Sequence, residues 1–206
     1  MKPIDQKIYL ASKSPRRREL LRQIGVEFEL LLPRDRSPRG PEVTEIVQPG
    51  EVAADYVTRV TQEKAECAKQ TMLWRKLPFR PILAADTTVV LNGNILGKPA
   101  DMAEACSMLK SLSGVTHQVL TSVAVQTIDD IWQITQTSDV EFATLSDKTI
   151  HAYCATQEPY DKAGGYAVQG VGALFIRGIL GSYSGIMGLP LFETAQLLEQ
   201  AGLRIL

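Results

Sequence analysis

Short apolar runs alternate with amphipathic stretches along the first part of this chain, as in proteins that pack helices against a sheet. Residues 8–11 predict a strand that passes directly into a helix over about residues 15–24, and residues 28–32 predict a second strand. Residues 33–50 are rich in Pro, Arg and Gly and lack periodicity, which predicts a loop long enough to be functional. Apolar residues near helical spacing then predict a long amphipathic helix over about residues 51–72.

The second half of the chain favours strands, with helices between them. Residues 81–91 predict a strand that turns at Asn92-Gly93 into a hairpin. Asp101 is placed to cap a helix that runs to about Leu112, and Ser146 to begin a short one. Further strands are predicted at residues 115–127, 131–142, 166–168 and 174–179, before a final helix after Pro190. No internal repeat divides the chain, and we expect one domain over residues 1–206.

Composition and charge narrow the class of protein. The 22 Lys and Arg nearly balance the 23 Asp and Glu, so no global basic field recruits nucleic acid and any affinity for anions must be local. The cysteines Cys67, Cys106 and Cys154 are odd in number and widely spaced, which suits a reducing compartment. No apolar run approaches the about 20 residues of a membrane span, and the N-terminus lacks the layout of a signal peptide. We therefore expect a cytoplasmic protein that does not bind membranes.

The junction between the first strand and the first helix has the properties of an anion site. Ser14 can cap the helix, and Pro15 suits its first position. The free N–H groups of a first helical turn favour negative charge. Residues 16–18 are all arginine, and three guanidinium groups on one turn repel one another unless phosphate or carboxylate oxygens lie between them. A solvated basic turn fits less well, because positive charge there opposes the helix dipole.

Familiar nucleotide and metal motifs are not matched. Residues 93–99 have three residues between the glycines of a P-loop-like segment instead of four, and Pro99 stands where Ser or Thr should bind Mg²⁺. Residues 170–172 lack the third glycine of a dinucleotide fingerprint, and strand-like residues follow them. With His117 and His151 as the only histidines, a zinc site is poorly supported, and His117 is more readily a structural strand residue.

Acidic and basic side chains in apolar surroundings are the best candidates for chemistry. Asp86 interrupts an apolar strand and would be costly to bury without a cation or hydrogen-bond donors. Lys98, just past the hairpin, and Lys64, on the long helix, can reach the same face, either as a structural Asp–Lys pair or as part of a site. Asp161-Lys162 adds an acid–base pair on a glycine-rich loop, where backbone can approach a ligand closely.

Taken together, these segments resemble the Maf family of nucleotide pyrophosphatases nearly end to end. The resemblance rests on eight ordered motifs: LASKSPRR at 10–17, QEKA at 62–65, ADT at 85–87, LGKP at 96–99, GVTHQV at 114–119, EPYDKAG at 158–164, VQG at 168–170 and GLP at 188–190. It implies an α/β fold with an elongated mixed sheet flanked by helices and two lobes around a central cleft. It also implies a homodimer and hydrolysis of nucleoside triphosphates, dependent on Mg²⁺ or Mn²⁺, to monophosphate and pyrophosphate, in a house-cleaning role for the nucleotide pool.

The resemblance also implies roles for individual residues. Asp86 matches the general base, and the phosphate-facing polar residues are matched by Ser12, Arg17, Lys64, Lys98 and Lys162. We expect Lys64 and Lys98 to act with Asp86 in catalysis, and Glu45, Asp86 and Asp161 to hold the metal. Glu42 competes with Glu45 because residues 34–39 form an atypical insertion in that loop. Lys13 and Ser184-Gly185 also depart from the usual family residues.

Substrate choice is suggested by Arg16, Thr87 and Gln169, which match the branch that resembles dTTP/UTP pyrophosphatases. The amide of Gln169 offers a donor and an acceptor to the edge of uracil or thymine, whereas a Glu would only accept. A rival interpretation is a non-catalytic nucleotide-binding regulator of cell division. A nucleic-acid module using residues 16–18 and 34–39 comes last, because the chain lacks net positive charge and an aromatic stacking platform.

Overall fold

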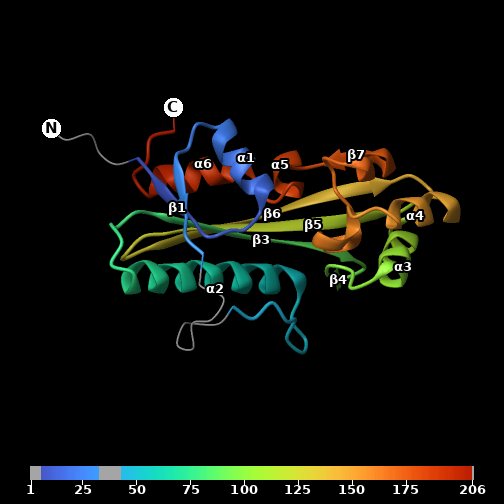
Figure 1. Ribbon diagram of the computed structural model, residues 1–206, viewed down its shortest axis with the longest axis horizontal. Helices are drawn as coiled ribbons and strands as arrows, with labels where there is room; N and C mark the ends of the chain where they lie inside the picture. Colours follow the sequence, from blue (N-terminus) through green and yellow to red (C-terminus); the bar gives the residue numbers. More distant parts are fainter. Residues whose placement is uncertain (1–5, 33–42, 206) are drawn as a thin grey trace.

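The protein, seen in a computed structural model that describes residues 6–32 and 43–205, is organised around one long mixed sheet (Figure 1). The strands are β1 (Ile8–Leu10), β2 (Phe28–Leu30), β3 (Ile82–Leu91), β4 (Asn94–Leu96), β5 (Thr116–Gln126), β6 (Ile131–Phe142) and β7 (Ile176–Leu180). Their order is β2-β1-β3-β5-β6-β7, with β4 paired to β3 as a hairpin. β1 runs parallel to β2 and β3, and the remaining pairs are antiparallel.

Helices cover both faces of this sheet. They are α1 (Pro15–Gln23), α2 (Ala53–Trp74), α3 (Met102–Leu112), α4 (Asp147–Cys154), α5 (Tyr183–Ile186) and α6 (Leu191–Gln200). Figure 1 shows α2 along one face, α1, α5 and α6 on the other, and α3 and α4 near one end. The α/β class with an elongated mixed sheet flanked by helices is confirmed, while two lobes around a cleft stay a prediction. Within the described residues, no helix is long and apolar enough to cross a membrane.

Local sequence signals account for several element boundaries. Ser14 accepts the N–H of Arg17 and caps α1, and Asp101 accepts the N–H of Glu104 and caps α3. Asn92 and Gly93 both have positive φ, as the predicted hairpin turn requires. Ser146 caps α4 as predicted.

Two predicted strands near the end of the chain need correction. Residues 166–168 form no strand, and residues 171–175 form a 3-10 helix, η3, that precedes β7. The cause is a long-range contact, because the Glu158 carboxylate accepts the N–H groups of Val171 and Gly172 and so stabilises the first turn of η3. Residues 34–39 and Glu42 lie outside the described residues.

The two largest of the five apolar clusters found among the described residues lie along the sheet, and the long strands contribute to both. One core contains Leu10, Leu83 and Val123 with residues of α1 and α6. The other contains Val89 and Val119 with residues of α3 and α4. The same strands also carry buried polar side chains, including Thr88, Thr121 and Ser122. Side chains alternate along a strand, so Asp86 lies on the opposite face of β3 from its neighbour Ala85, facing Lys64 of α2.

Candidate active site

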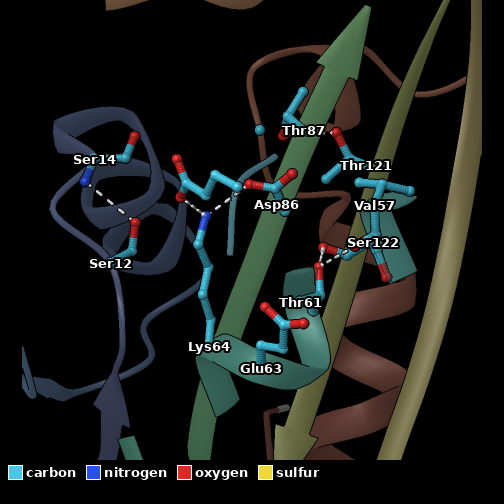
Figure 2. A network of polar contacts seen from close by, with 12 residues as sticks. Ser12, Ser14, Val57, Thr61, Glu63, Lys64, Asp86, Thr87, Thr121 and Ser122 are labelled. Carbon is cyan, nitrogen blue, oxygen red and sulfur yellow. Dashed lines mark hydrogen bonds and ion pairs between the residues drawn. The ribbon is translucent and has the colours of Figure 1, made fainter. Parts of the chain in front are cut away.

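Asp86 and Glu45 meet on the ammonium group of Lys64. Asp86 Oδ1 lies 2.7 Å from Lys64 Nζ, and Glu45 Oε1 lies 2.6 Å from the same nitrogen. Figure 2 shows Lys64 pointing from α2 toward Asp86 on β3. The Asp86 side chain is 13% exposed, so its charge is largely removed from water and is balanced by Lys64. Sequence reasoning predicted that Asp86 would need such a cation, and the structure confirms it.

Small residues bring α2 close enough for Lys64 to reach the sheet. Ala65, the next residue of α2, packs with Ala84 of β3 and Ala124 of β5 in a cluster of fully buried alanines. Side chains of this size allow helix and sheet to approach closely, because there is little to hold the backbones apart. The long side chain of Lys64 then lies along the gap with its charge at Asp86.

The Glu45 carboxylate stays ionised in this arrangement. Partial burial would raise the pKa of Glu45, but the hydrogen bond from Lys64 and the charges of Lys64, Lys98 and Arg17 outweigh it, and the pKa is lowered. Lys98 is exposed and close enough to act on Glu45 through its charge. Glu45 and Asp86 are therefore both in contact with Lys64, and the charge of Lys98 also acts on Glu45.

Arg17 turns inward from α1 and is held by hydrogen bonds to residues distant in the chain. Nε donates to the carbonyl oxygen of Gly188 at 2.6 Å, Nη1 to Ser12 Oγ at 3.2 Å and Nη2 to Thr87 Oγ1 at 3.1 Å. Burial lowers the pKa of Arg17, and the charge of Asp86 opposes that effect. The crowded arginine turn predicted from the sequence is thus relieved in part by protein oxygens.

The bonds of Arg17 continue into a chain whose direction is fixed. A guanidinium can only donate and a carbonyl oxygen can only accept. Arg17 donates to Thr87, whose hydroxyl lies 2.9 Å from that of Thr121, and Thr121 donates to the carbonyl oxygen of Gly185 at 2.8 Å. Since the Thr121 proton is used on Gly185, Thr87 must donate to Thr121. Figure 2 shows the two threonines side by side on β3 and β5.

A second acidic group lies on the glycine-rich loop. Asp161 is paired with Lys162 and lies 3.7 Å from the Nη1 atom of Arg16. Partial burial would raise the pKa of Asp161, but Lys162 and Arg16 outweigh it and the pKa is lowered. Lys162 Nζ also donates to the carbonyl oxygen of Glu158 at 2.7 Å. Arg16 and Lys162 are therefore brought together here.

Among the described residues, no group of three or more His, Cys, Asp or Glu side chains could hold a metal ion, so Asp161 does not complete a triple carboxylate with Glu45 and Asp86. The two carboxylates that do converge fit a hard divalent cation. Mg²⁺ is usually held by one or two protein carboxylates together with substrate phosphates and water. Glu45 and Asp86 already share one cationic group, the ammonium of Lys64.

Gln169 and His117, the remaining candidates, lie outside these clusters of charged side chains. Gln169 is exposed, two residues before Val171, whose N–H is fixed by Glu158. His117 is a structural strand residue as predicted, buried on β5 with its Nε2 atom 2.7 Å from the hydroxyl of Tyr166.

Sequence reasoning missed three residues that support this site: Arg59, Thr121 and Glu158. The i,i+4 spacing of Arg59 and Glu63 was a usable signal for an ion pair on α2. Glu158 stands inside a motif already noted, but its contact with η3 is not visible in the sequence. Thr121 offered no signal, because it looks like any residue of an alternating strand.

The molecule is a mixed α/β protein in which Glu45 and Asp86 converge on Lys64. The sequence profile described as "Maf-like protein" matches residues 7–201, and the chain belongs to the Maf family.

Several relatives in this family share about half of their residues with the chain. A protein of Aromatoleum aromaticum named dTTP/UTP pyrophosphatase is 54% identical over 203 residues, or 98% of each chain. A protein of Nitrosospira multiformis with the same name is 50% identical over 202 residues, again 98% of each. The solved structure of the Staphylococcus aureus Ham1 protein is 15% identical with a TM-score of 0.43, covering 66% of this chain and 72% of that one.

Proposed function

We propose that this protein hydrolyses nucleoside triphosphates, with dTTP and UTP preferred, to the monophosphate and pyrophosphate. The observation that carries the proposal is the convergence of Glu45 and Asp86 on Lys64, beside the charge of Lys98. The names of relatives about 50% identical over nearly the whole chain support the choice of reaction and substrate. A homodimer and a cytoplasmic location stay predictions.

We infer the following catalytic roles for the chain's own residues. Glu45 and Asp86 would hold Mg²⁺ or Mn²⁺, which when bound supplies charge for the phosphate oxygens and lowers the pKa of water. Asp86 accepts a proton from the attacking water as its oxygen forms a bond to the α-phosphorus. The bond from the α-phosphorus to the oxygen bridging it to the β-phosphorus breaks, and pyrophosphate leaves with that oxygen. Lys64, Lys98 and Lys162 stabilise the charge that develops on the phosphate oxygens.

Base recognition is assigned to Gln169, with Arg16 and Thr87 expected to shape its pocket. Gln169 is exposed and can present both a donor and an acceptor to a pyrimidine. Arg16 is engaged with Asp161, and the Thr87 hydroxyl is engaged with Arg17 and Thr121. Gln169 is assigned to reading the base, Arg16 and Thr87 to shaping its pocket, and Ser12 and Arg17 to facing the phosphates.

Turnover in ¹⁸O-labelled water tests the proposal. The purified protein is incubated with UTP or dTTP and Mg²⁺, and the products are separated by mass. We expect pyrophosphate without label and monophosphate with one labelled oxygen. Label in the inorganic product would move the attack away from the α-phosphorus, and tight nucleotide binding without turnover would favour the regulator instead.

A further inference from the structure

All five N–H donors of Arg59, on α2, form hydrogen bonds with the loop before α2 or with Glu63 of the same helix. A guanidinium has five N–H donors. Nε and Nη2 donate to the two oxygens of Glu51 at 2.7 and 2.9 Å, and Nη1 donates to Glu63 Oε1 at 2.9 Å. The other two donors reach main-chain oxygens, Nη1 that of Thr44 at 3.0 Å and Nη2 that of Ile46 at 3.1 Å. A side chain with five acceptors in place has a single orientation.

The two main-chain oxygens belong to the residues on either side of Glu45. Glu63 also restrains this segment, because its second oxygen accepts the N–H of Thr44 at 2.8 Å. Tyr56 lies one turn earlier on α2, and its hydroxyl donates to the carbonyl oxygen of Glu45 at 3.4 Å. Residues 44–46 are thus held by three side chains on one face of α2, and the Glu45 side chain is directed to Lys64 on the same helix.

These hydrogen bonds are needed to fix the loop before α2, because the loop has no regular secondary structure of its own. Residues 43–52 belong to no helix or strand, and Ile46 is 72% exposed. A carboxylate on such a segment would sample many positions unless side chains restrained its backbone. The ion pair is suited to that task, since the hydrogen bond from Arg59 lowers the pKa of Glu51 to about 2 and keeps it charged at any working pH.

We propose that Arg59, anchored by Glu51 and Glu63, is a positioning residue that fixes Glu45 beside Asp86 and so builds the divalent-cation site. This inference rests on the proposed function in one respect, that Glu45 and Asp86 hold the cation. Replacing a residue that orients a metal ligand through hydrogen bonds typically lowers metal affinity or activity by about 10- to 100-fold.

Arg59→Lys is the central test, because it keeps the positive charge but cannot reach five acceptors. Arg75→Lys is the matched control, an arginine at the end of the same helix whose Nη2 donates to Leu32. We expect Arg59→Lys to raise the Mg²⁺ concentration for half-maximal activity by about 10- to 100-fold. The KM for UTP at saturating Mg²⁺ should change little, and Arg75→Lys should leave both values unchanged. An unaltered Mg²⁺ requirement in a folded Arg59→Lys protein would overturn the proposal.

A second readout does not depend on activity. In metal-free protein, hydrogen exchange of the Thr44 amide should be faster in Arg59→Lys than in wild type, and unchanged in Arg75→Lys. If Arg59→Lys does not fold, Glu51→Gln replaces it, because the amide keeps the shape of Glu51 and removes the charge. Equal protection of the Thr44 amide in wild type and variant would show that Arg59 does not restrain residues 44–46.

A double-mutant cycle separates this proposal from the proposed function. If Arg59 acts through Glu45, then Arg59→Lys adds no further rise in the Mg²⁺ requirement once Glu45→Gln is present. Independent, additive effects would overturn the positioning role. If Glu45→Gln alone leaves the Mg²⁺ requirement unchanged, the metal assignment fails, and the exchange experiment still reports whether Arg59 restrains the loop.

Discussion

Lys64 Nζ lies 2.7 Å from Asp86 Oδ1, and the two side chains come from different layers of the fold. The lysine belongs to α2 and the aspartate to the middle of β3. A carboxylate there could serve structure alone, but Glu45 approaches the same ammonium at 2.6 Å. Two carboxylates on one ammonium group favour a site that can also hold a divalent cation over a structural ion pair.

Asp86→Asn is therefore expected to abolish hydrolysis while the fold is kept. The amide has nearly the same volume, but it cannot accept a proton and binds a divalent cation less well. Loss of a general base typically costs about 10²- to 10⁴-fold in rate. Turnover of UTP and circular dichroism should be measured together, with Asp139→Asn on β6 as the control. More than half of the wild-type rate in the folded variant would remove Asp86 from the role of base.

Gln169→Glu is expected to weaken the use of pyrimidines selectively. The carboxylate loses the donor half of the pair and faces a carbonyl oxygen of the base. Once the bound base covers the Gln169 side chain, loss of one hydrogen-bond partner costs about 1–3 kcal/mol, or roughly five- to a hundred-fold in kcat/KM. Kinetics with UTP, dTTP, CTP, GTP and ATP test this, with Gln196→Glu on α6 as the control. Equal losses on every nucleotide would assign Gln169 to the fold or to the phosphates instead.

The part of the fold that is determined locally could be predicted from the sequence. Ser14 and Asp101 cap helices through their own side chains, and the Asn92-Gly93 turn needs the positive φ that these residues tolerate. The 3-10 helix at residues 171–175 could not be predicted, because its first N–H groups are held by Glu158, more than ten residues earlier.

The candidate site was predictable in its members but less so in its contacts. Asp86 in an apolar strand demanded a cation, and Lys64 provides it. The inward turn of Arg17 onto Gly188 depends on how distant segments pack, and no local signal encodes it. Asp161 was expected with the other acids, yet it pairs with Lys162 and Arg16, since cations of its own loop and of α1 lie nearer.

Thr121→Val is expected to lower both stability and activity. The substitution leaves the Thr87 hydroxyl without its acceptor and the carbonyl oxygen of Gly185 without its donor, in a place where Thr121 is fully buried. A buried polar group left unpaired costs about 1–3 kcal/mol. Urea unfolding measures the stability, and kcat/KM for UTP measures the loss of a fixed Arg17.

Two controls distinguish loss of the hydroxyl from altered packing. Thr121→Ser restores the hydrogen-bond chain and should recover most of the activity, at the cost of about 0.8 kcal/mol for the lost methyl group. Thr61→Val removes another buried hydroxyl, one that bonds the carbonyl oxygen of Val57 within α2, and should leave activity near that of wild type. Equal activity of Thr121→Val and wild type would show that the chain does not hold Arg17.

We expect His117 to lower the free energy of unfolding in mild acid relative to neutral pH. Burial lowers the pKa of His117 to about 4, and its Nδ1 atom has no hydrogen-bond partner among the described residues. The unfolded chain binds a proton below about pH 6.5, whereas the folded protein stays neutral there until about pH 4, so stability falls as the pH drops through this window. Between pH 8 and pH 5 this one group should cost about 2 kcal/mol.

Urea unfolding of wild type and His117→Gln at both pH values isolates that contribution. Other groups titrate in both proteins, so the difference in their pH dependence belongs to position 117. His151→Asn, at an exposed position on α4, is the control for replacing a histidine. The Tyr166 hydroxyl beside His117 does not confuse the result, because burial raises the pKa of Tyr166 and keeps it neutral throughout. If His117→Gln lost as much stability as wild type between pH 8 and pH 5, His117 would be protonated in the folded protein, and its placement as a buried neutral residue would be wrong.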